Sequence, residues 1–285
     1  MRSGGGGRPC CQLTSASGVN HAGIEMRHPE TDLFRSQRHR SVPRFVSHRG
    51  YTPLAPESSL PGFAYAGLLG QWAIETDVHL TRDGVLVCCH DEAVDAMYDG
   101  TGAIADMTWA ELSRLRLRSG SRLDCFAEEE LRMPLFSDYL QICRVFGSVP
   151  FIELKVPVGE RVMDAVRQSG FAESQVIVST FHLSWLTQTR EAAPDVFLHH
   201  IFSDEPSMHR LAQLGNAGIS WNFRDPADLT RAQVAGVREL GLRMCLRAAD
   251  SWGAVARMQD LGLDYVPTNT MHAANPLSSS MAMAG

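Results

Sequence analysis

Apolar residues along this chain fall into short alternating runs, and longer stretches of helical spacing separate most of these runs. The clearest run is 73–80, where the even-numbered side chains are apolar or small and the odd-numbered ones after Ala73 are Glu75, Asp77 and His79. The pattern predicts strands over 44–48, 73–80, 85–90, 149–155, 175–180, 196–201, 217–221, 242–246 and 264–267. It predicts helices over 60–69, 108–117, 134–146, 159–169, 183–192, 207–214, 228–240 and 251–261.

Eight of these strands alternate with helices, and residues 85–90 are an additional return strand. Such alternation indicates a parallel sheet covered by helices, and eight units indicate a closed barrel. The sequence therefore predicts an α/β fold: a single (β/α)8 TIM barrel over 43–272, with a short hairpin and loop-helix insertion after the second strand. Residues 1–42 read as a flexible tail and 273–285 as a loose one. An open doubly wound sheet is the alternative, but no G-x-G-x-x-G follows any strand.

The turn after residue 80 contains Asp83-Gly84, which favours a tight reversal. A loop of two residues would place His90 opposite Asp77, and a loop of four would place it opposite Glu75. In either register His90 shares a face with both carboxylates, because side chains alternate with a period of two.

The composition of the chain limits the kinds of protein that it can form. A length of 285 residues allows one large barrel or two ordinary domains, and 44% apolar residues suffice for a sizeable core. A net charge of -6 argues against nucleic-acid binding. Seven cysteines without a C-x-x-C pair suit a reducing compartment. No apolar run is long enough to span a membrane and no secretory signal is evident, so we expect a cytoplasmic protein.

Polar residues that handle phosphate or a cation stand at or near strand ends. Glu75, Asp77 and Glu153 offer the oxygen ligands that Mg²⁺ or Ca²⁺ prefers. Because the carboxyl ends of parallel barrel strands meet at one mouth, these side chains are expected to converge. Two histidines that can transfer protons, His48 and His90, stand at other predicted strand ends.

Two cations complete the set, Arg49 and Lys155, and either can bind an anion. The chain has 26 Lys and Arg together, of which Lys155 is the one lysine. An ammonium is compact and strongly hydrated, whereas a guanidinium is a planar fork. We interpret Lys155 as a position where the planar guanidinium of an arginine could not replace the compact ammonium.

Each group also has a structural interpretation. Glu75 and Asp77 alone would more often form a solvated strand face, but Glu153 and Lys155 lie in an apolar run, where a buried carboxylate needs a partner or a metal. Histidines at 79, 182, 199 and 200 lack a partner motif and are interpreted as structural, packing or surface groups. Phe181 and Trp221, at later strand ends, are candidates for lining a substrate pocket.

Order and spacing of the motifs resemble the glycerophosphodiester phosphodiesterase family from about residue 45 to 276. The matching pieces are His48-Arg49-Gly50, Ala55-Pro56-Glu57-Ser58, Glu75-Thr76-Asp77-Val78, Thr81 to Gly84, His90-Asp91 and Glu153-Leu154-Lys155. The resemblance implies a barrel, a divalent cation and hydrolysis of a glycerophosphodiester, a small molecule, to glycerol 3-phosphate and an alcohol.

Residue by residue, the resemblance assigns Glu75, Asp77 and Glu153 to the metal and His48 and His90 to the acid/base pair. It places Arg49 and Lys155 at phosphate-contacting positions. The chain departs from the family at Ser58, where Asn is usual, at 244–247, where Trp-Thr-Val-Asn is usual, and at Asn269, where Asp is usual. The missing Asn at position 58 is expected to loosen the order around the metal or His48, and the altered eighth-strand region bears on substrate choice more than on chemistry.

Two other functions fit the same residues. A barrel that binds a phosphorylated ligand without turnover is suggested by the departures at Ser58, Arg247 and Asn269. A lysophospholipase D would keep the chemistry and enlarge the leaving group, although no amphipathic membrane helix is evident.

Overall fold

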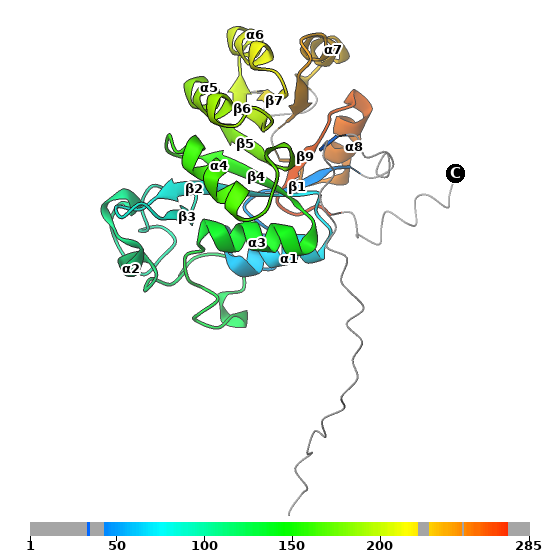
Figure 1. The fold of residues 1–285 in the computed structure, drawn as a ribbon. Helices are drawn as coiled ribbons and strands as arrows, with labels where there is room; N and C mark the ends of the chain where they lie inside the picture. Colours follow the sequence, from blue (N-terminus) through cyan, green and yellow to red (C-terminus); the bar gives the residue numbers. More distant parts are fainter. Residues whose placement is uncertain (1–32, 35–42, 222–227, 247, 273–285) are drawn as a thin grey trace, which may run out of the picture.

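The computed structural model describes residues 33–34, 43–221, 228–246 and 248–272, in which strands alternate with helices (Figure 1). The strands are β1 (Phe45–Ser47), β2 (Ala73–Leu80), β3 (Leu86–Cys88), β4 (Val149–Leu154), β5 (Ile177–Thr180), β6 (Phe197–Ser203), β7 (Ala217–Trp221), β8 (Arg243–Cys245) and β9 (Val266–Thr268). The α-helices are α1 (Leu60–Leu68), α2 (Trp109–Leu112), α3 (Phe136–Phe146), α4 (Gly159–Gln168), α5 (Leu183–Ala192), α6 (Glu205–Leu214), α7 (Arg231–Glu239) and α8 (Trp252–Leu261). Short 3₁₀ helices include η2 (Ile104–Asp106), η3 (Leu123–Cys125) and η4 (Glu173–Gln175).

Eight parallel strands form a nearly closed barrel in the order β8-β7-β6-β5-β4-β2-β1-β9, and β3 pairs antiparallel with β2 outside this path. Between β8 and β9 the backbone is joined by single hydrogen bonds, from Asp264 N to Met244 O at 2.9 Å and from Ala249 N to Pro267 O at 2.7 Å. The predicted (β/α)8 barrel is thus confirmed, with β9 as the eighth barrel strand.

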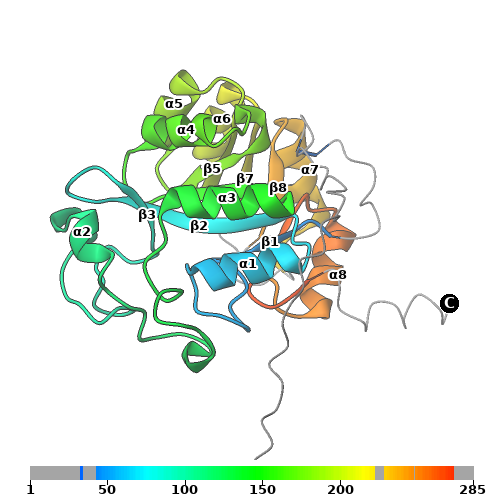
Figure 2. The same ribbon diagram turned by 60° about the horizontal axis from the view of Figure 1, so that its bottom comes forward.

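The helices lie outside the strands, and their apolar faces form the main core. Phe63 of α1 and Tyr139 of α3 pack edge to face with ring centroids 5.1 Å apart, which holds these two helices side by side (Figure 2). Tyr139 also donates a hydrogen bond to Ile74 O at 2.6 Å and accepts one from Phe151 N at 3.0 Å. This buried hydroxyl therefore ties α3 to β2 and β4, the two strands that carry the acidic residues. Of the helices described, none has the length and apolarity to cross a bilayer.

A second cluster fills the barrel interior and reaches its lower end. Its buried members include Val46, Ala73, Val149, Phe151, Ile177, Phe197, Cys245 and Tyr265. Leu33 and Phe34 join this cluster: Leu33 is buried, and the Phe34 ring lies 5.0 Å from Phe197 and 5.5 Å from Trp72. These two residues are therefore packed, which differs from the flexible tail expected over 1–42; the remainder of that tail up to residue 42 and all of 273–285 lie outside the described residues.

The insertion after β2 has a satellite core, and it shortens one predicted helix. The Thr108 hydroxyl and the Glu111 carboxylate form a capping box at the start of α2. The helix ends at Leu112 rather than residue 117, because the chain turns away to make other hydrogen bonds. Arg116 N donates to Asp99 Oδ1 at 2.7 Å, and Leu117 N donates to Leu131 O at 2.9 Å.

The hairpin register also differs from both predicted registers. Val78 pairs with Cys88 and Leu80 with Leu86, so five residues, 81–85, connect the strands. The Thr81 hydroxyl holds this longer turn, since it donates to Asp83 Oδ1 at 2.6 Å and accepts from Val85 N at 2.9 Å. The prediction that strand pairing places His90 opposite a carboxylate is therefore wrong; β3 ends at Cys88, and His90 reaches its position from the loop that follows.

Candidate active site

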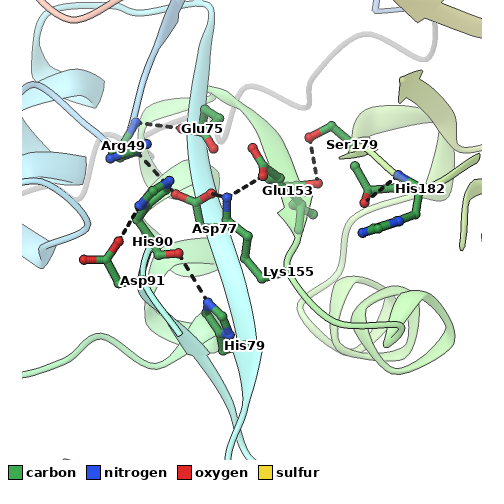
Figure 3. Close-up of polar contacts among 12 residues, drawn as sticks. Arg49, Glu75, Asp77, His79, His90, Asp91, Glu153, Lys155, Ser179 and His182 are labelled. Atoms are coloured by element: carbon green, nitrogen blue, oxygen red, sulfur yellow. Dashed lines mark hydrogen bonds and ion pairs between the residues drawn. The ribbon is translucent and has the colours of Figure 1, made fainter. Parts of the chain in front are cut away.

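The three acidic residues predicted to hold a metal meet at the mouth of the barrel. Asp77 of β2 and Glu153 of β4 are register partners on neighbouring parallel strands, and Glu75 stands two residues before Asp77 on the same face. One oxygen from each carboxylate lies within 4.8 Å of the others. Figure 3 shows Asp77 and Glu153 pointing toward one another across the two strands. Convergence of the trio, expected from strand ends, is present in the structure.

The three carboxylates are largely shielded from water, so their negative charges would destabilise the fold if no positive charge lay nearby. Burial, followed by repulsion from Asp77 and Glu153, raises the pKa of Glu75 well above its ordinary value. Burial and Asp77 also raise the pKa of Glu153, although Lys155 opposes the shift. An added cation would favour the ionised form of each carboxylate.

Two basic side chains contact the trio from opposite sides. Lys155 Nζ lies 2.5 Å from Glu153 Oε1 and 2.9 Å from Asp77 Oδ1. Arg49 lies across from it, with its backbone N–H donating to Glu75 Oε2 at 2.8 Å and its Nε 3.5 Å from Asp77 Oδ2. The ammonium reaches two carboxylates at once as a compact charge, which accords with the interpretation of the one lysine.

The donor set fits a hard divalent cation. Asp77 is fully buried, and neither of its carboxylate oxygens has a hydrogen bond of good geometry despite the nearby Lys155 and Arg49. Buried carboxylate oxygens that lack well-directed hydrogen-bond donors are suited to metal coordination, and three carboxylates are the oxygen ligands that Mg²⁺ and Ca²⁺ take. Glu75, Asp77 and Glu153 are the residues that would hold it.

His48 follows β1 directly and is held on two sides. Its backbone N–H donates to Thr268 O at 2.9 Å, and its ring Nδ1 lies 2.9 Å from Asn269 Oδ1. Burial lowers the pKa of His48, with Arg49 contributing in the same direction, while the Asn269 contact opposes the shift. The imidazole is therefore kept in the form that accepts a proton near neutrality.

His90 approaches from the loop after β3. Its Nδ1 lies 2.7 Å from Asp91 Oδ1, and its backbone carbonyl lies 3.4 Å from His79 Nε2 (Figure 3). His79 itself is buried. The structural role expected for His79 thus consists of holding the backbone of a residue at the site.

A cavity of about 330 Å³ unites these groups, and its walls differ in character. One side carries the polar residues His48, Arg49, Glu75, His90, Glu153 and Lys155. The apolar lining residues come mostly from β5 to β8 and include Phe181, Ile201, Phe202 and Leu246, joined by Phe151 of β4 and Pro267 of β9. The arrangement suits a ligand with an anionic centre and an apolar portion.

The aromatic candidates are placed differently from one another. Phe181 lines the cavity and is 47% exposed, and its ring packs edge to face with that of Phe202 at 5.4 Å. Trp221 is not among the described residues that line the cavity; it is half-buried against the main hydrophobic cluster. Its role in substrate binding stays a prediction.

Two further histidines of the described residues, His199 and His200, are buried in the barrel strand β6, whereas His182 is exposed. His199 lies inside, where burial lowers its pKa to about 3 and its Nδ1 lies 2.5 Å from the Tyr265 hydroxyl. His200 bonds Ser203 Oγ at 2.6 Å and the Phe181 carbonyl at 3.1 Å, which supports the exposed aromatic pair. Among these, His199 also lines the cavity, a placement that the sequence did not indicate.

The family departures have local explanations. Ser58 is buried with φ of 48°, in the left-handed region that Asn tolerates better than most side chains. Cys245 and Leu246 belong to the apolar side of the cavity. Arg247 lies outside the described residues. Asn269 forms a hydrogen bond with His48.

The sequence analysis does not single out Asp250, which contacts Asn269 on the side away from His48. The available signal was the position of Asp250 in the loop after a strand.

Comparison with curated relatives gives one consistent name. The chain is 32% identical over 157 residues to glycerophosphodiester phosphodiesterase of Caldanaerobacter subterraneus, covering 52% of this chain and 62% of the relative. It is 29% identical over 238 residues to a glycerophosphodiester phosphodiesterase of Bacillus altitudinis, covering 79% and 94%. The chain thus spans less than two thirds of the first of these relatives, and about a third of a human one.

Solved structures show the same barrel. A glycerophosphodiester phosphodiesterase from Agrobacterium tumefaciens is 25% identical with a TM-score of 0.69, covering 80% of this chain and 96% of that one. An Oleispira antarctica phosphodiesterase, solved with the product sn-glycerol-3-phosphate, has a TM-score of 0.71 at 22% identity, covering 85% and 97%. The family model described as glycerophosphoryl diester phosphodiesterase matches residues 48–273. The chain therefore belongs to the glycerophosphoryl diester phosphodiesterase family.

Proposed function

We propose that this protein is a metal-dependent phosphoric diester hydrolase that cleaves glycerophosphodiesters to sn-glycerol 3-phosphate and an alcohol. The observation that carries the proposal is one cavity lined by His48 and His90, by two of the three clustered carboxylates and by both basic side chains. A phosphodiester needs a place for its charge, a proton acceptor and a proton donor. Family membership supports the same reaction.

A divalent cation held by Glu75, Asp77 and Glu153 would stabilise negative charge that develops on the phosphoryl oxygens. Arg49 and Lys155 would hold the phosphate on either side of it. We name Mg²⁺ or Ca²⁺ because all three ligands are carboxylates, and both ions prefer oxygen ligands.

The two histidines divide the proton transfers. Neutral His48 removes a proton from the attacking hydroxyl, either the adjacent glycerol hydroxyl or water, as the new P–O bond forms. His90 supplies a proton to the departing alkoxide as the old P–O bond breaks. Attack by the glycerol hydroxyl would give a cyclic phosphate, which water then opens.

The test is release of sn-glycerol 3-phosphate from glycerophosphocholine in Mg²⁺ or Ca²⁺, with and without EDTA. We expect chelation to abolish activity and His48→Ala to lower kcat by about 10²-fold or more. His209→Ala, at an exposed histidine of α6, is the matched control and should retain activity. Full turnover in EDTA, or in His48→Ala, contradicts the proposal; tight binding without hydrolysis in Mg²⁺, Ca²⁺, Mn²⁺ or Zn²⁺ favours a non-catalytic phosphate-binding barrel.

The apolar side of the cavity favours a second substrate class. Phe181 and Phe202 present aromatic surface where a hydrophobic part of the substrate could lie, as a lysophospholipase D requires. For such an enzyme, kcat/KM for lysophosphatidylcholine would exceed that for glycerophosphocholine, and Phe181→Ser would reduce only the former. Equal losses on both substrates would remove this alternative. The cytoplasmic location and the absence of a nucleic-acid partner stay predictions.

A further inference from the structure

An acidic residue stands directly behind Asn269, on the side away from His48. Asp250, in the loop between β8 and α8, accepts hydrogen bonds through Oδ1 from Asn269 N at 2.7 Å and Thr268 Oγ1 at 3.0 Å. Its other oxygen, Oδ2, accepts from Asn269 Nδ2 at 2.6 Å. Burial alone would raise the pKa of Asp250, but these hydrogen bonds lower it below its ordinary value. The carboxylate is thus ionised and fully engaged with one short segment of chain.

The donor and acceptor roles along this line follow from chemistry. An ionised carboxylate only accepts, so the Asn269 group that faces Asp250 must be its Nδ2 amide. The Asn269 oxygen is then left to face His48, and an amide oxygen also only accepts. The His48 nitrogen at 2.9 Å from it, Nδ1, must therefore carry a hydrogen. Because burial lowers the pKa of His48, the ring carries one proton, and Nε2 is free to accept another.

We propose that Asp250, Asn269 and His48 form a hydrogen-bond relay that fixes His48 in the tautomer protonated on Nδ1, so that Nε2 is the proton acceptor. The catalytic role of this relay rests on the function proposed above, whereas the tautomer of His48 does not depend on that function. Asp250 and Asn269 are positioning residues in this relay, because they act on the reaction through His48.

The relay accounts for one departure from the family. With an aspartate at position 269, a negative charge would adjoin the imidazole ring and favour its protonated form. Here the uncharged Asn269 amide contacts the ring, and Asp250 fixes the orientation of that amide. The negative charge therefore lies on Asp250, which is separated from the ring by Asn269. The ring is held as firmly but remains a neutral base.

The tautomer can be read in the intact protein by ¹⁵N NMR of histidine-labelled enzyme, without substrate and in EDTA. His48 is assigned by comparison with His48→Gln. We expect the Nδ1 resonance of His48 in the range of a protonated nitrogen and Nε2 in the range of an unprotonated one. A wild-type His48 protonated on Nε2 would overturn the relay.

Two variants test how the tautomer is set. Asp250→Asn would place an NH₂ group against Asn269 Nδ2, so the Asn269 amide should rotate and present its own NH₂ to His48. The ring would then have to accept through Nδ1 and carry its proton on Nε2. We expect this switch in the spectrum and a fall in kcat for glycerophosphocholine of about 10²-fold or more.

The exchange variant D250N/N269D restores the pattern. The amide introduced at position 250 keeps its oxygen for the backbone of residue 269 and donates its NH₂ to the carboxylate introduced there, which again accepts from His48 Nδ1. We expect the Nδ1-protonated signal to return, and most of the lost kcat with it at a pH above the higher pKa that the adjacent carboxylate gives His48. Asp260→Asn, which removes an exposed carboxylate from the far end of α8, is the control and should change neither readout.

The outcomes separate the two proposals. A tautomer switch together with loss of kcat, both reversed by the exchange, supports the relay and the proposed function. A tautomer switch with unchanged kcat keeps the relay and overturns the catalytic role of His48. Loss of kcat without a switch, in a variant whose melting temperature matches the wild type, overturns the relay. If Asp250→Asn does not fold, the wild-type spectrum still decides.

Discussion

At the scale of single residues, the site is dominated by acids placed where water cannot stabilise them. Glu75 and Asp77 are buried in a strand, and Glu153 adjoins them. Lys155 and Arg49 offset part of this cost, but the raised pKa of Glu75 shows that the remainder is substantial. Such a cluster costs stability when no cation is bound, so removing one acid should stabilise the metal-free protein.

Glu75→Gln should stabilise the metal-free protein, and increasingly so as the pH rises. Because the folded-state pKa of Glu75 is raised, the folded protein binds its proton more tightly than the unfolded chain. Wild-type stability therefore falls as the pH rises from the ordinary value of 4.5 through the raised pKa. In EDTA at pH 7 we expect Glu75→Gln to unfold in urea with a free energy higher by roughly 1–3 kcal/mol.

Repeating the urea titration at pH 4 and in excess Mg²⁺ or Ca²⁺ provides the controls. The difference should shrink at pH 4, where Glu75 is protonated in both states, and reverse in the divalent cation, which the variant binds less tightly. A Gln variant that is less stable than the wild type in EDTA at pH 7 would contradict this account.

Ser58 is a residue whose backbone conformation conflicts with its side chain. Its φ of 48° favours Gly or Asn, and its buried hydroxyl has no hydrogen-bond partner among the described residues. Ser58→Gly should therefore raise the free energy of unfolding by about 0.5–1 kcal/mol, because the relief of strain exceeds the added entropy of the unfolded chain. Thermal unfolding of Ser58→Gly beside Ser58→Ala measures it; a lower melting temperature for Gly than for Ala would refute it.

At the scale of elements, the loop from β1 to α1 places His48 and Arg49 by an unusual backbone. Arg49 has φ of 57° and Gly50 φ of 83°. This left-handed pair aims the Arg49 N–H at Glu75 and lets Gly50 approach α1 closely.

Gly50→Ala should disrupt this loop, because its Cβ would lie 2.7 Å from the backbone carbon of Gly62. We expect a loss of about 2–4 kcal/mol from strain and overlap together. Gly70→Ala is the matched control: its φ is also positive, at 68°, but its Cβ would meet nothing within 4 Å, so about 1 kcal/mol should be lost. Urea unfolding of both variants measures the difference, and equal losses would show that backbone overlap plays no part.

The elements also show where sequence patterns succeed. Helix α5 and strand β7 lie at the residues predicted for them, α5 because apolar residues recur at helical spacing and β7 because it is a short, mostly buried run. The register of β2 and β3 was not predicted, since it depends on hydrogen bonds that the Thr81 hydroxyl donates to Asp83 and accepts from Val85 N, which periodicity does not record. For the same reason the convergence of Glu75, Asp77 and Glu153 was foreseeable from strand ends, whereas the contact of Asp250 with Asn269, across two loops, was not.

At the scale of the whole molecule, residues 33–34, which precede the first strand, pack against the end of the barrel at which the strands begin. Phe34 packs on Trp72, Phe197 and Tyr265, and its carbonyl accepts a hydrogen bond from Arg44 at 3.0 Å. The pattern of eight units predicted the barrel itself, but a two-residue apolar plug in a polar segment has no period to reveal it.

Removing this plug should weaken the barrel without changing its chemistry. Phe34→Ala deletes a ring that is only half-buried, so we expect a loss of about 2–3 kcal/mol, less than for a fully buried phenylalanine. Leu68→Ala, at a leucine that is 68% exposed, is the control and should cost under about 0.5 kcal/mol. Urea unfolding checks both, and equal stability of Phe34→Ala and wild type would show that residues 33–34 do not support the barrel.

The unique lysine has a practical consequence. An endoproteinase that cuts after lysine has a single target in this chain, at the mouth end of β4 and within reach of two carboxylates. Cleavage there divides the molecule into residues 1–155, which hold every acid and imidazole of the proposed chemistry, and 156–285, which hold most of the apolar wall. Resistance of that one bond to digestion would thus be a label-free gauge of how tightly the two halves of the barrel remain closed around the acidic centre.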